Sequence, residues 1–384
     1  MPSPYYFQLP TQIIYGRYCA NQIGKVAGNL GLKKVMIVTD PGVAKSGVLD
    51  QILPYLKEAG INAITFDEVE PNPTVQSVDK AAALYAKEGC EGVIAVGGGS
   101  PLDAGKAVGV LATNPGSASD YLGNDKVKIP CAPVIGVPTT AGTSAEITDV
   151  AVLSDRTKKA KIGVRSAYVS PRIALLDPAL TLGLPPAPTR DSGLDTLTHA
   201  VESYLNINSW ETSGALSLKA IELVGQHLRT AVHNGKDIEA RDGMLMASLL
   251  AGIAFHNTKL CLVHAITGPM GGFYNAPHGA INAIILPHAM RFMLPGAVSK
   301  YVDIAVALGE SVEGLSEREA AEKAVSAIEQ LSRDVGLPKG LSVYGVKADD
   351  LPALAETIAA SFMVSLSPRV AKKEDILEVC KASL

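Results

Sequence analysis

Short, continuous runs of apolar residues recur through the first half of the chain and constrain its fold more than any other feature. They occupy residues 35–40, 63–66, 92–96, 134–137 and 173–176. Continuous rather than alternating apolar runs indicate strands buried on both faces. Between them, residues 49–60 and 75–89 have helical periodicity and end in glycine, a common helix stop. The first half therefore predicts βαβ units and a mostly parallel, Rossmann-like sheet.

A proline cluster marks the end of this pattern. Three of the four residues 185–188 are proline, which continues neither a central strand nor a helix. Beyond the cluster, apolar residues recur at helical spacing over 194–205, 213–232, 241–254, 317–335 and 351–360. We therefore expect two domains, an α/β domain over residues 1–185 and an all-helical domain over residues 186–384.

Composition excludes several classes of function. A formal charge of −4, with 19% charged residues, leaves no basic stripe of the kind that nucleic-acid binding requires. Apolar runs such as 283–286 are far shorter than the roughly 20 residues that span a bilayer. The N-terminus lacks a basic segment followed by an apolar one, so we expect neither a secretory signal nor a membrane partner. Five cysteines without C-x-x-C spacing indicate free thiols in a reducing cytoplasm.

Four side chains in the second half have the spacing of a metal site. Asp195 and His199 are four residues apart, so a helix would place the carboxylate and the imidazole on one face. His264 and His278 follow in a second, glycine-rich segment. One carboxylate and three imidazoles form a donor set that suits a divalent first-row metal such as iron or zinc.

Each of these residues also has an ordinary interpretation. A D-x3-H pair occurs by chance in many helices, and a lone histidine is usually a satisfied polar group or a surface residue. Three of the seven histidines fall in or beside apolar, glycine-rich segments, which favours the metal interpretation for those three. We interpret the others as structural residues: His227, His233, His256 and His288.

The segment after the third apolar run has the composition of a phosphate site. Residues 93–96 lead directly into Gly97-Gly98-Gly99-Ser100-Pro-Leu-Asp103. A strand that ends in glycines and opens a helix lets backbone N–H groups approach an anion, and a pyrophosphate would fit there. The segment is neither G-x-G-x-x-G nor the lysine-containing P-loop, and a tight strand-to-helix turn explains the glycines about as well.

A second loop follows the next strand and presents Thr139, Thr140 and Thr143 around a glycine. Two such loops at strand C-termini in one sheet indicate a ligand crevice, where open α/β sheets bind nucleotides. The ordinary alternative is a helix N-cap at Thr143 or Ser144, which is compatible with cofactor binding.

Asp40 closes the first clear strand. An acidic residue at such a strand end can hydrogen-bond the ribose hydroxyls of NAD and repel the extra phosphate of NADP. An aspartate before a proline is also an ordinary turn starter, so both interpretations stay open for this residue.

Together these residues resemble the iron-dependent (group III) alcohol dehydrogenase family, which includes lactaldehyde reductase and 1,3-propanediol dehydrogenase. The resemblance covers nearly the whole chain and implies that family's architecture, a dehydroquinate synthase-like pairing of an α/β domain with a helical one. The segments that carry it, in the family's order, are 15–16, 97–103, 138–146, 193–202 and 272–279.

The resemblance also implies residue roles. The four metal ligands match Asp195, His199, His264 and His278, with iron as the expected metal and zinc as the alternative. The pyrophosphate turn matches Gly97, Gly98, Gly99 and Ser100, followed by Asp103, and the nicotinamide-side loop matches Thr139, Thr140 and Thr143. Further cofactor contacts match Asn72, Lys161 and Leu180, and the NAD-preferring position matches Asp40.

The implied chemistry is hydride transfer assisted by a metal. A metal with an open coordination position would bind the substrate oxygen and ease the loss of an alcohol's proton, while the carbinol hydride passes to nicotinamide. We therefore expect an NAD-dependent alcohol dehydrogenase or aldehyde reductase that acts on a small alcohol, diol or aldehyde. The resemblance implies a homodimer or a larger homo-oligomer.

The chain departs from the family's pattern on the substrate side. Many members have a second histidine where this chain has Gly268, and a Gly-Asn-Pro-Arg ending where it has 365–369. Glycine cannot exchange protons, and the loss of a ring opens volume for a bulkier or more polar substrate. Drift at dispensable positions is the alternative explanation. The residues expected to line the pocket are Val150, Phe255, Gly268 and Met363.

Other functions within the same superfold stay open at this point. A dehydroquinate-synthase-like or glycerol-dehydrogenase-like enzyme also uses a metal and NAD, but a site for an anionic cyclic substrate should be rich in lysine and arginine. The segments around His264 and His278 contain few of these residues. A non-catalytic metal or nucleotide sensor is a third alternative, which a missing ligand or a broken glycine turn would have favoured.

Overall fold

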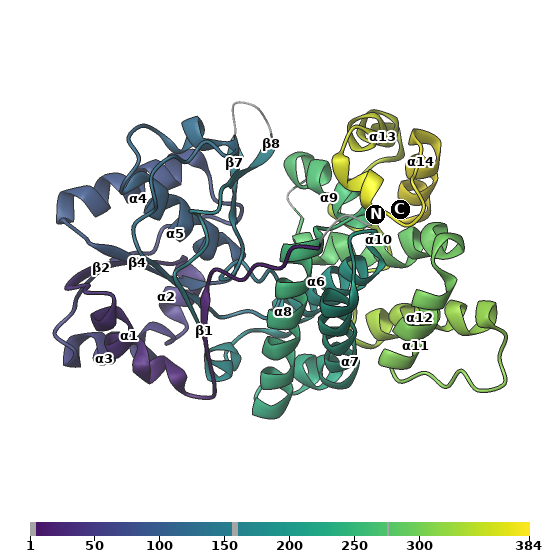
Figure 1. The fold of residues 1–384 in the computed structure, drawn as a ribbon, viewed down its shortest axis with the longest axis horizontal. Coiled ribbons are helices and arrows are strands. Elements are labelled where there is room, and N and C mark those ends of the chain that lie inside the picture. The colour runs from purple at the N-terminus through teal and green to yellow at the C-terminus, as the bar shows by residue number, and fades with distance from the viewer. Residues whose placement is uncertain (1–4, 156–159, 275) are drawn as a thin grey trace. The chain divides into compact units, whose positions relative to one another are not determined.

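The computed structural model describes residues 5–155, 160–274 and 276–384, which form two compact units. The first, here called the sheet unit, comprises Leu9–Leu184 and contains every strand of the described residues. The second, the helical unit, comprises Pro185–Leu384 together with residues 5–8. In Figure 1 the sheet unit runs from purple to teal and the helical unit from green to yellow, apart from its N-terminal residues.

The N-terminal residues belong to a different unit from the one that the expected domain division gives them. Residues 5–8 belong to the helical unit and not to the sheet unit, and the boundary lies after Leu184. The Tyr5 ring stacks on Trp210 with centroids 5.2 Å apart. The Gln8 backbone N–H also donates to Asn257 Oδ1 at 2.6 Å. A single ring contact between residues far apart in the chain leaves no repeating pattern in the sequence, so periodicity cannot predict where these residues pack.

The main sheet is six-stranded, and every pair of neighbouring strands is parallel, which confirms the predicted α/β class. All five predicted strands are present, and β1 adds an unpredicted edge strand. In spatial order the strands are β1 (Gln12–Tyr15), β9 (Ile173–Leu176), β6 (Val134–Pro138), β4 (Gly92–Gly97), β2 (Lys34–Val38) and β3 (Asn62–Phe66).

Helices cover both faces of this sheet. Alternate strand residues point to opposite sides, and the residues on both sides are apolar and buried. Met36 and Val93 belong to one buried cluster, and Val35 and Ile94 belong to another. Such two-sided burial explains why the strands read as continuous apolar runs.

The helices of this unit are α1 (Ile23–Asn29), α2 (Pro41–Lys45), α3 (Leu53–Glu58), α4 (Val75–Glu88) and α5 (Gly99–Leu111). A second, three-stranded sheet contains β5 (Gly123–Asn124), β8 (Ala160–Arg165) and β7 (Val150–Asp155).

The strand order places a topological switch between β2 and β4. The chain leaves β2 for its neighbour β3 on one side and then returns to form β4 on the other. Open parallel sheets bind ligands beyond the carboxyl ends of the strands at such a point. The residues that follow β2 and β4 are Asp40 and the glycine turn at 97–99, so both lie at this edge.

The helical unit begins inside the proline cluster. Helix α6 (Pro186–Leu205) starts at Pro186, eight residues before the predicted start, because proline is tolerated in the first turn, where the N–H groups have no intrahelical partner. The other predicted helices are α7 (Glu211–His233), α8 (Ile238–Thr258), α12 (Glu317–Asp334) and α13 (Leu351–Ala359). Unpredicted helices are α9 (Leu262–Phe273), α10 (His278–Met293), α11 (Val298–Ala307) and α14 (Lys373–Ala382).

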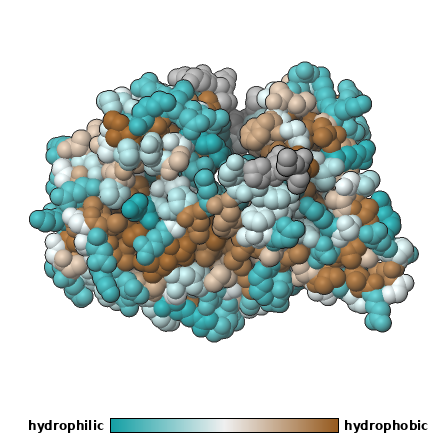
Figure 2. Space-filling model, viewed as in Figure 1, coloured by the Kyte–Doolittle hydropathy of each residue, from teal (hydrophilic) through white to brown (hydrophobic). Residues whose placement is uncertain are grey.

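The surface is mixed in character. Figure 2 shows apolar residues among hydrophilic ones on one face of the molecule. The exposed large apolar side chains of the protein include Tyr18, Ile207 and Phe362. Scattered apolar surface of this kind is normal for a globular protein. Among the described residues, no single helix is long and apolar enough to span a membrane; α8 joined to Leu262–Gly271 passes that test only as a pair bent by 97°.

Candidate functional site

Helix α6 presents a buried polar stripe. Asp195, His199 and Glu202 lie four and three residues apart on this helix, so they share one face. All three are buried, with exposed fractions of 2%, 5% and 0%. Buried charged and polar groups are costly unless they are paired, so this stripe needs partners on the neighbouring helices.

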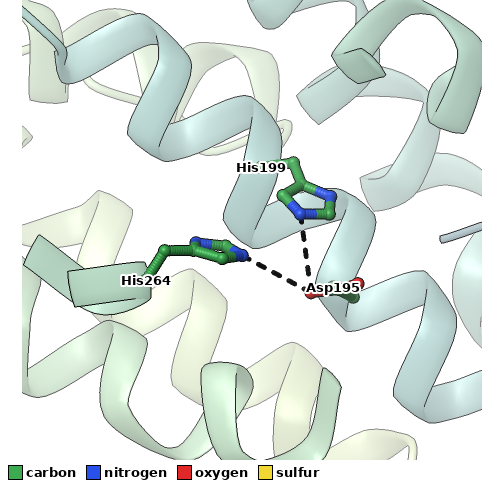
Figure 3. A group of neighbouring side chains, drawn as sticks. All are labelled: Asp195, His199 and His264. Atoms are coloured by element: carbon green, nitrogen blue, oxygen red, sulfur yellow. Dashed lines mark ion pairs between the residues drawn. The ribbon is translucent and has the colours of Figure 1, made fainter. Parts of the chain in front are cut away.

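His264, on α9, lies next to Asp195 and His199 of this stripe. Figure 3 shows the side chains of Asp195, His199 and His264 pointing toward one another, and their ligand atoms all lie within 4.8 Å of one another. The Nε2 atoms of His199 and His264 are 3.8 and 4.0 Å from Asp195 Oδ1. Three of the four predicted ligands therefore converge, and one cation could contact a donor atom of each.

His278, the fourth predicted ligand, lies beside this group at the start of α10. Its ring centroid is 5.4 Å from that of His264, and the residue is exposed. The first turn of α10 packs tightly on α6 because Gly279 has no side chain; a Cβ there would lie 2.1 Å from the carbonyl oxygen of Asp191. This close approach brings His278 next to the buried ligands. Asn275, in the motif that precedes it, lies outside the described residues.

Glu202 holds His264 in place. Its Oε2 accepts a hydrogen bond from His264 Nδ1 at 2.6 Å, and its Oε1 accepts from the Val263 N–H at 2.6 Å. The His264 backbone N–H also donates to Oε2 at 3.3 Å, so the carboxylate caps the first turn of α9. Because Nδ1 carries the proton in this bond, the lone pair of His264 is on Nε2, which faces Asp195.

Asn282 is the second supporting residue. It follows His278 by one turn of α10 and is fully buried. Its Nδ2 lies 2.7 Å from Asp195 Oδ1, 3.1 Å from His264 Nε2 and 3.0 Å from His278 Nε2. Its Oδ1 is buried without a hydrogen-bond partner.

The surrounding groups keep Asp195 ionised. Burial by itself would raise the pKa of this carboxyl group. The neighbouring His199, His278 and His264 and the hydrogen bond from Asn282 outweigh burial, so the pKa of Asp195 lies below its ordinary value. An ionised carboxylate among imidazoles is the form that binds a divalent cation.

The predicted substrate residues of the helical unit lie near the histidines. The Phe255 ring on α8 is 4.5 Å from the His199 ring, centroid to centroid. Gly268 is one turn after His264 on α9 and is exposed, and a Cβ added there would meet nothing within 4 Å. Met363 is half-buried in a 3-10 turn, η8 (Phe362–Leu366), which packs on α9. Val150 belongs to β7 of the sheet unit.

In the sheet unit, the two predicted nucleotide loops contact each other. A Cβ on Gly98 would lie 3.3 Å from Thr140 Cγ2, and a Cβ on Gly99 would lie 2.8 Å from Thr143 Cγ2. The glycines therefore allow close packing of the loops after β4 and β6. Thr139 is buried, and its N–H donates to the carbonyl of Gly97 at 3.0 Å. The N-terminus of α5 has no side-chain cap, so its N–H groups could meet an anion.

Three further predicted cofactor residues come together beside this turn. The Asn72 N–H donates to Ser100 Oγ at 3.2 Å, and Lys161 Nζ donates to Asn72 Oδ1 at 2.7 Å. Asn72 has a left-handed backbone, with φ of 59°, which asparagine tolerates better than most residues. Burial lowers the pKa of Lys161 below its ordinary value.

Asp40 caps a helix and also lies beside the glycine turn. Its Oδ1 accepts from the N–H groups of Gly42 and Val43 as the N-cap of α2. Its Oδ2 lies 3.5 Å from the position of a Cβ on Gly97, so the carboxylate also borders the glycine turn.

Two predicted cofactor residues have mainly structural contacts. Asp103 forms an ion pair with the buried Lys106 at 2.9 Å and accepts from the Val152 N–H at 3.0 Å. Burial raises its pKa, against the charge of Lys106, which lowers it. Leu180 is buried in the apolar cluster of one sheet face, within the 3-10 turn η4 (Pro178–Thr181).

Comparison with known proteins identifies the family. The sequence pattern described as iron-containing alcohol dehydrogenase matches residues 10–178, and the C-terminal pattern of the Fe-containing alcohol dehydrogenase family matches residues 189–384. This chain belongs to the iron-containing alcohol dehydrogenase family. It is therefore an oxidoreductase that acts on an alcohol or an aldehyde.

Similar alcohol dehydrogenases and reductases align over almost the whole chain. The 1,3-propanediol dehydrogenase of Klebsiella pneumoniae is 40% identical over 97% of each chain. Lactaldehyde reductase of Escherichia coli is 38% identical over 95% of this chain and 96% of its own. The NAD-dependent methanol dehydrogenase of Bacillus methanolicus is 35% identical over 98% of this chain and 99% of its own.

Solved structures of the family have the same fold. A 1,3-propanediol oxidoreductase structure superposes with a TM-score of 0.97 at 39% identity, covering 100% of both chains. A sulfoacetaldehyde reductase from Bifidobacterium kashiwanohense, solved in complex with NAD+, superposes with a TM-score of 0.88 at 26% identity over 100% of this chain and 99% of its own.

Sequence reasoning about this alcohol dehydrogenase missed Glu202 and Asn282. Signals for both were present. Glu202 continues the Asp195/His199 spacing by three residues, and Asn282 follows His278 by four. At these spacings on a helix, the side chains lie on the same face as the ligands.

Replacing Glu202 with glutamine should destabilise this alcohol dehydrogenase by about 2 kcal/mol, because three N–H groups lose a charged acceptor. Guanidinium unfolding of chelator-treated protein measures the change. Glu222→Gln on α7 is the matched control, since Glu222 is a surface residue paired with Lys219, and it should cost less than about 1 kcal/mol. Equal stability of the two variants would contradict the role of Glu202.

Proposed function

We propose that this enzyme transfers hydride between NAD(H) and a small alcohol or aldehyde, assisted by a divalent metal bound by Asp195, His199, His264 and His278. The observation that carries the proposal is the convergence of Asp195, His199 and His264, two of them from one helix, in a buried position. Iron is the metal that the family name favours, and zinc is the alternative.

The donor set fits a metal. Asp195 Oδ1, His264 Nε2 and His278 Nε2 all lie within 3.1 Å of the one amide nitrogen of Asn282. An amide nitrogen has two hydrogens for these three acceptors, so the acceptors outnumber the hydrogens. A cation would satisfy all of them together, and oxygen with imidazole nitrogen is a donor set that both iron and zinc accept.

Each residue around the proposed metal has a separate role in the reaction. A bound metal would supply Lewis-acid polarisation of the substrate oxygen. Asp195 contributes the negative charge that offsets the cation, and Glu202 keeps the His264 lone pair on Nε2. Phe255 packs against His199 and excludes water from that side of the imidazole. Gly268 offers no proton-exchanging group and leaves open space one turn from His264.

NAD is the cofactor that the sheet unit favours. The glycine turn, the uncapped start of α5 and the threonine loop lie at the carboxyl edge of the sheet, on strands next to the switch point. In this proposal, the turn and Ser100 hold the pyrophosphate, and Asp40 meets the adenosine ribose. The name of the methanol dehydrogenase and the NAD+ complex of the sulfoacetaldehyde reductase support this choice.

We also propose a cellular location, an oligomeric state and a substrate size for the enzyme. Its five cysteines are free thiols, which suits the cytoplasm, where thiols stay reduced. We propose a homodimer or a larger homo-oligomer, as the family resemblance implies. The open space at Gly268 favours a substrate larger or more polar than a simple primary alcohol.

An aldehyde-reduction assay tests the proposal directly. Loss of NADH absorbance at 340 nm is expected with short aldehydes when Fe²⁺ or Zn²⁺ is added to chelator-treated protein. His199→Ala should lower kcat/KM by about a thousandfold, because a metal site without a ligand loses several kcal/mol of barrier reduction. His233→Ala is the matched control, since His233 is an exposed residue at the end of α7 whose ring hydrogen-bonds the carbonyl of Asp334, and it should keep full activity.

The outcomes of this assay separate the alternatives. No NADH oxidation with any metal would exclude the proposed reaction and favour a lyase or a sensor. In a panel of ethanol, 1,2-propanediol and 1,3-propanediol assayed with NAD+, and of charged aldehydes assayed with NADH, best turnover with ethanol would contradict an enlarged pocket at Gly268.

Asp40→Gly should shift cofactor preference toward NADP. Removal of the carboxylate beside the glycine turn ends its repulsion of a ribose phosphate and its hydrogen bond to the ribose hydroxyls. The ratio of kcat/KM for NADPH to that for NADH should rise at least about tenfold, the equivalent of about 1.4 kcal/mol. Asp40→Asn keeps a side chain that can cap α2, so it separates charge from capping. An unchanged ratio in both variants would remove Asp40 from the cofactor site.

A further inference from the structure

We propose that Asn282 is a positioning residue that competes with the metal for the ligand lone pairs, so that it holds the ligands together before metal binds and weakens metal affinity. The inference rests on the metal centre of the proposed function and deepens it. Neither the spacing argument nor the family resemblance had assigned a role to this residue.

The position of Asn282 is fixed by the fold. Its side chain is fully buried and comes from α10 one turn after His278. The contact of Gly279 with the backbone of Asp191 holds this end of α10 against α6. The amide therefore stays at 2.7 Å from Asp195 Oδ1 without freedom to swing into solvent.

The neighbours of the amide dictate its orientation. The Asp195 oxygen that faces the amide accepts a hydrogen bond from it, and His264 Nε2 carries a lone pair because the N–H at Nδ1 donates to Glu202. Both groups require an N–H. A reversed amide would place Oδ1 against a carboxylate oxygen and an imidazole lone pair, which is repulsive. The buried Oδ1 has no hydrogen-bond partner in the present orientation, so the contacts of Nδ2 decide the orientation.

The chemistry of the acceptors makes the amide and a metal compete. An imidazole nitrogen has one lone pair, which binds either an N–H or a cation. A carboxylate oxygen has two, so Asp195 could keep its bond to Asn282 while it binds a metal. Metal binding therefore costs the contacts of Asn282 with His264 and His278, and only those.

Two properties follow from this competition. Without a metal, the Asn282 amide donates to the buried carboxylate of Asp195 and lies within hydrogen-bond distance of the His264 and His278 rings, so it stabilises the assembled ligand set. With a metal, most of that stabilisation is lost. Removal of the amide should therefore destabilise the metal-free protein more than the metal-bound protein, which by linkage means tighter metal binding.

The test measures metal affinity and thermal stability, with no substrate or cofactor. Chelator-treated full-length protein is titrated with Zn²⁺ and Co²⁺ in competition with a chelator of known affinity, and Tm is recorded with and without each metal. In Asn282→Ala, the metal-free Tm should fall by about 3–8 °C. The metal-bound Tm should fall less, and Kd for Zn²⁺ should tighten about tenfold.

Two further variants make the outcome unambiguous. Asn282→Leu keeps a side chain of similar size and removes both amide hydrogens without adding a charge or a metal ligand, so it should also tighten Zn²⁺ binding and repeats the test if the alanine variant does not fold. Leu286→Ala, at a buried position one turn further along α10, controls for lost packing. It should lower both Tm values equally and leave Kd unchanged within about twofold.

The two proposals fail in different ways. If wild-type protein binds Zn²⁺ and Co²⁺ but neither Asn282 variant binds them more tightly, the competition is overturned and the metal centre stands. If wild-type protein binds neither metal and its Tm does not respond, both the metal centre and the role of Asn282 are overturned.

Discussion

The buried charge of Asp195 is the constraint on which the architecture of the helical unit depends. A carboxylate with an exposed fraction of 2% loses several kcal/mol of hydration unless opposite charge or donors replace the water. Here the replacements come from three helices: His199 on α6, His264 on α9, and His278 with Asn282 on α10. The packing of these helices is thus tied to the chemistry of one side chain, and the net effect is a pKa below the ordinary value.

Two further buried residues, Glu202 and Asn282, hydrogen-bond the proposed ligands. Glu202 continues the face of α6 that carries Asp195 and His199, and it both caps α9 and fixes the proton of His264 on Nδ1. Asn282 acts from α10 and donates to the carboxylate of Asp195. Second-layer groups of this kind orient metal ligands and tune affinity. In this protein they also join α6 to α9 and α10 through directional hydrogen bonds.

Much of this arrangement could be predicted from the sequence, and the remainder has physical reasons for being missed. Continuous apolar runs predict the parallel strands well, because strands buried on both faces leave that pattern. Helices α9 and α10 were missed because they are apolar almost all round and contain Pro269 and Pro287, so they lack an amphipathic period. The start of α6 is not predicted by the periodicity, because the proline cluster interrupts the apolar pattern although proline is compatible with the first turn of a helix. Asp195, His199 and His264, which spacing and composition predict as ligands, converge in the structure, whereas Glu202 and Asn282 act through contacts between helices that a linear pattern does not specify.

The central claim is that a single divalent metal is held where Asp195 and the three histidines meet. Anomalous X-ray diffraction from crystals grown with iron or zinc, measured on both sides of the metal's absorption edge, tests this most directly. The account predicts one strong anomalous peak per chain, within about 2.0–2.2 Å of Asp195 and of the histidine nitrogens. A peak at another place in the chain, or no peak from crystals grown with saturating metal, would contradict it.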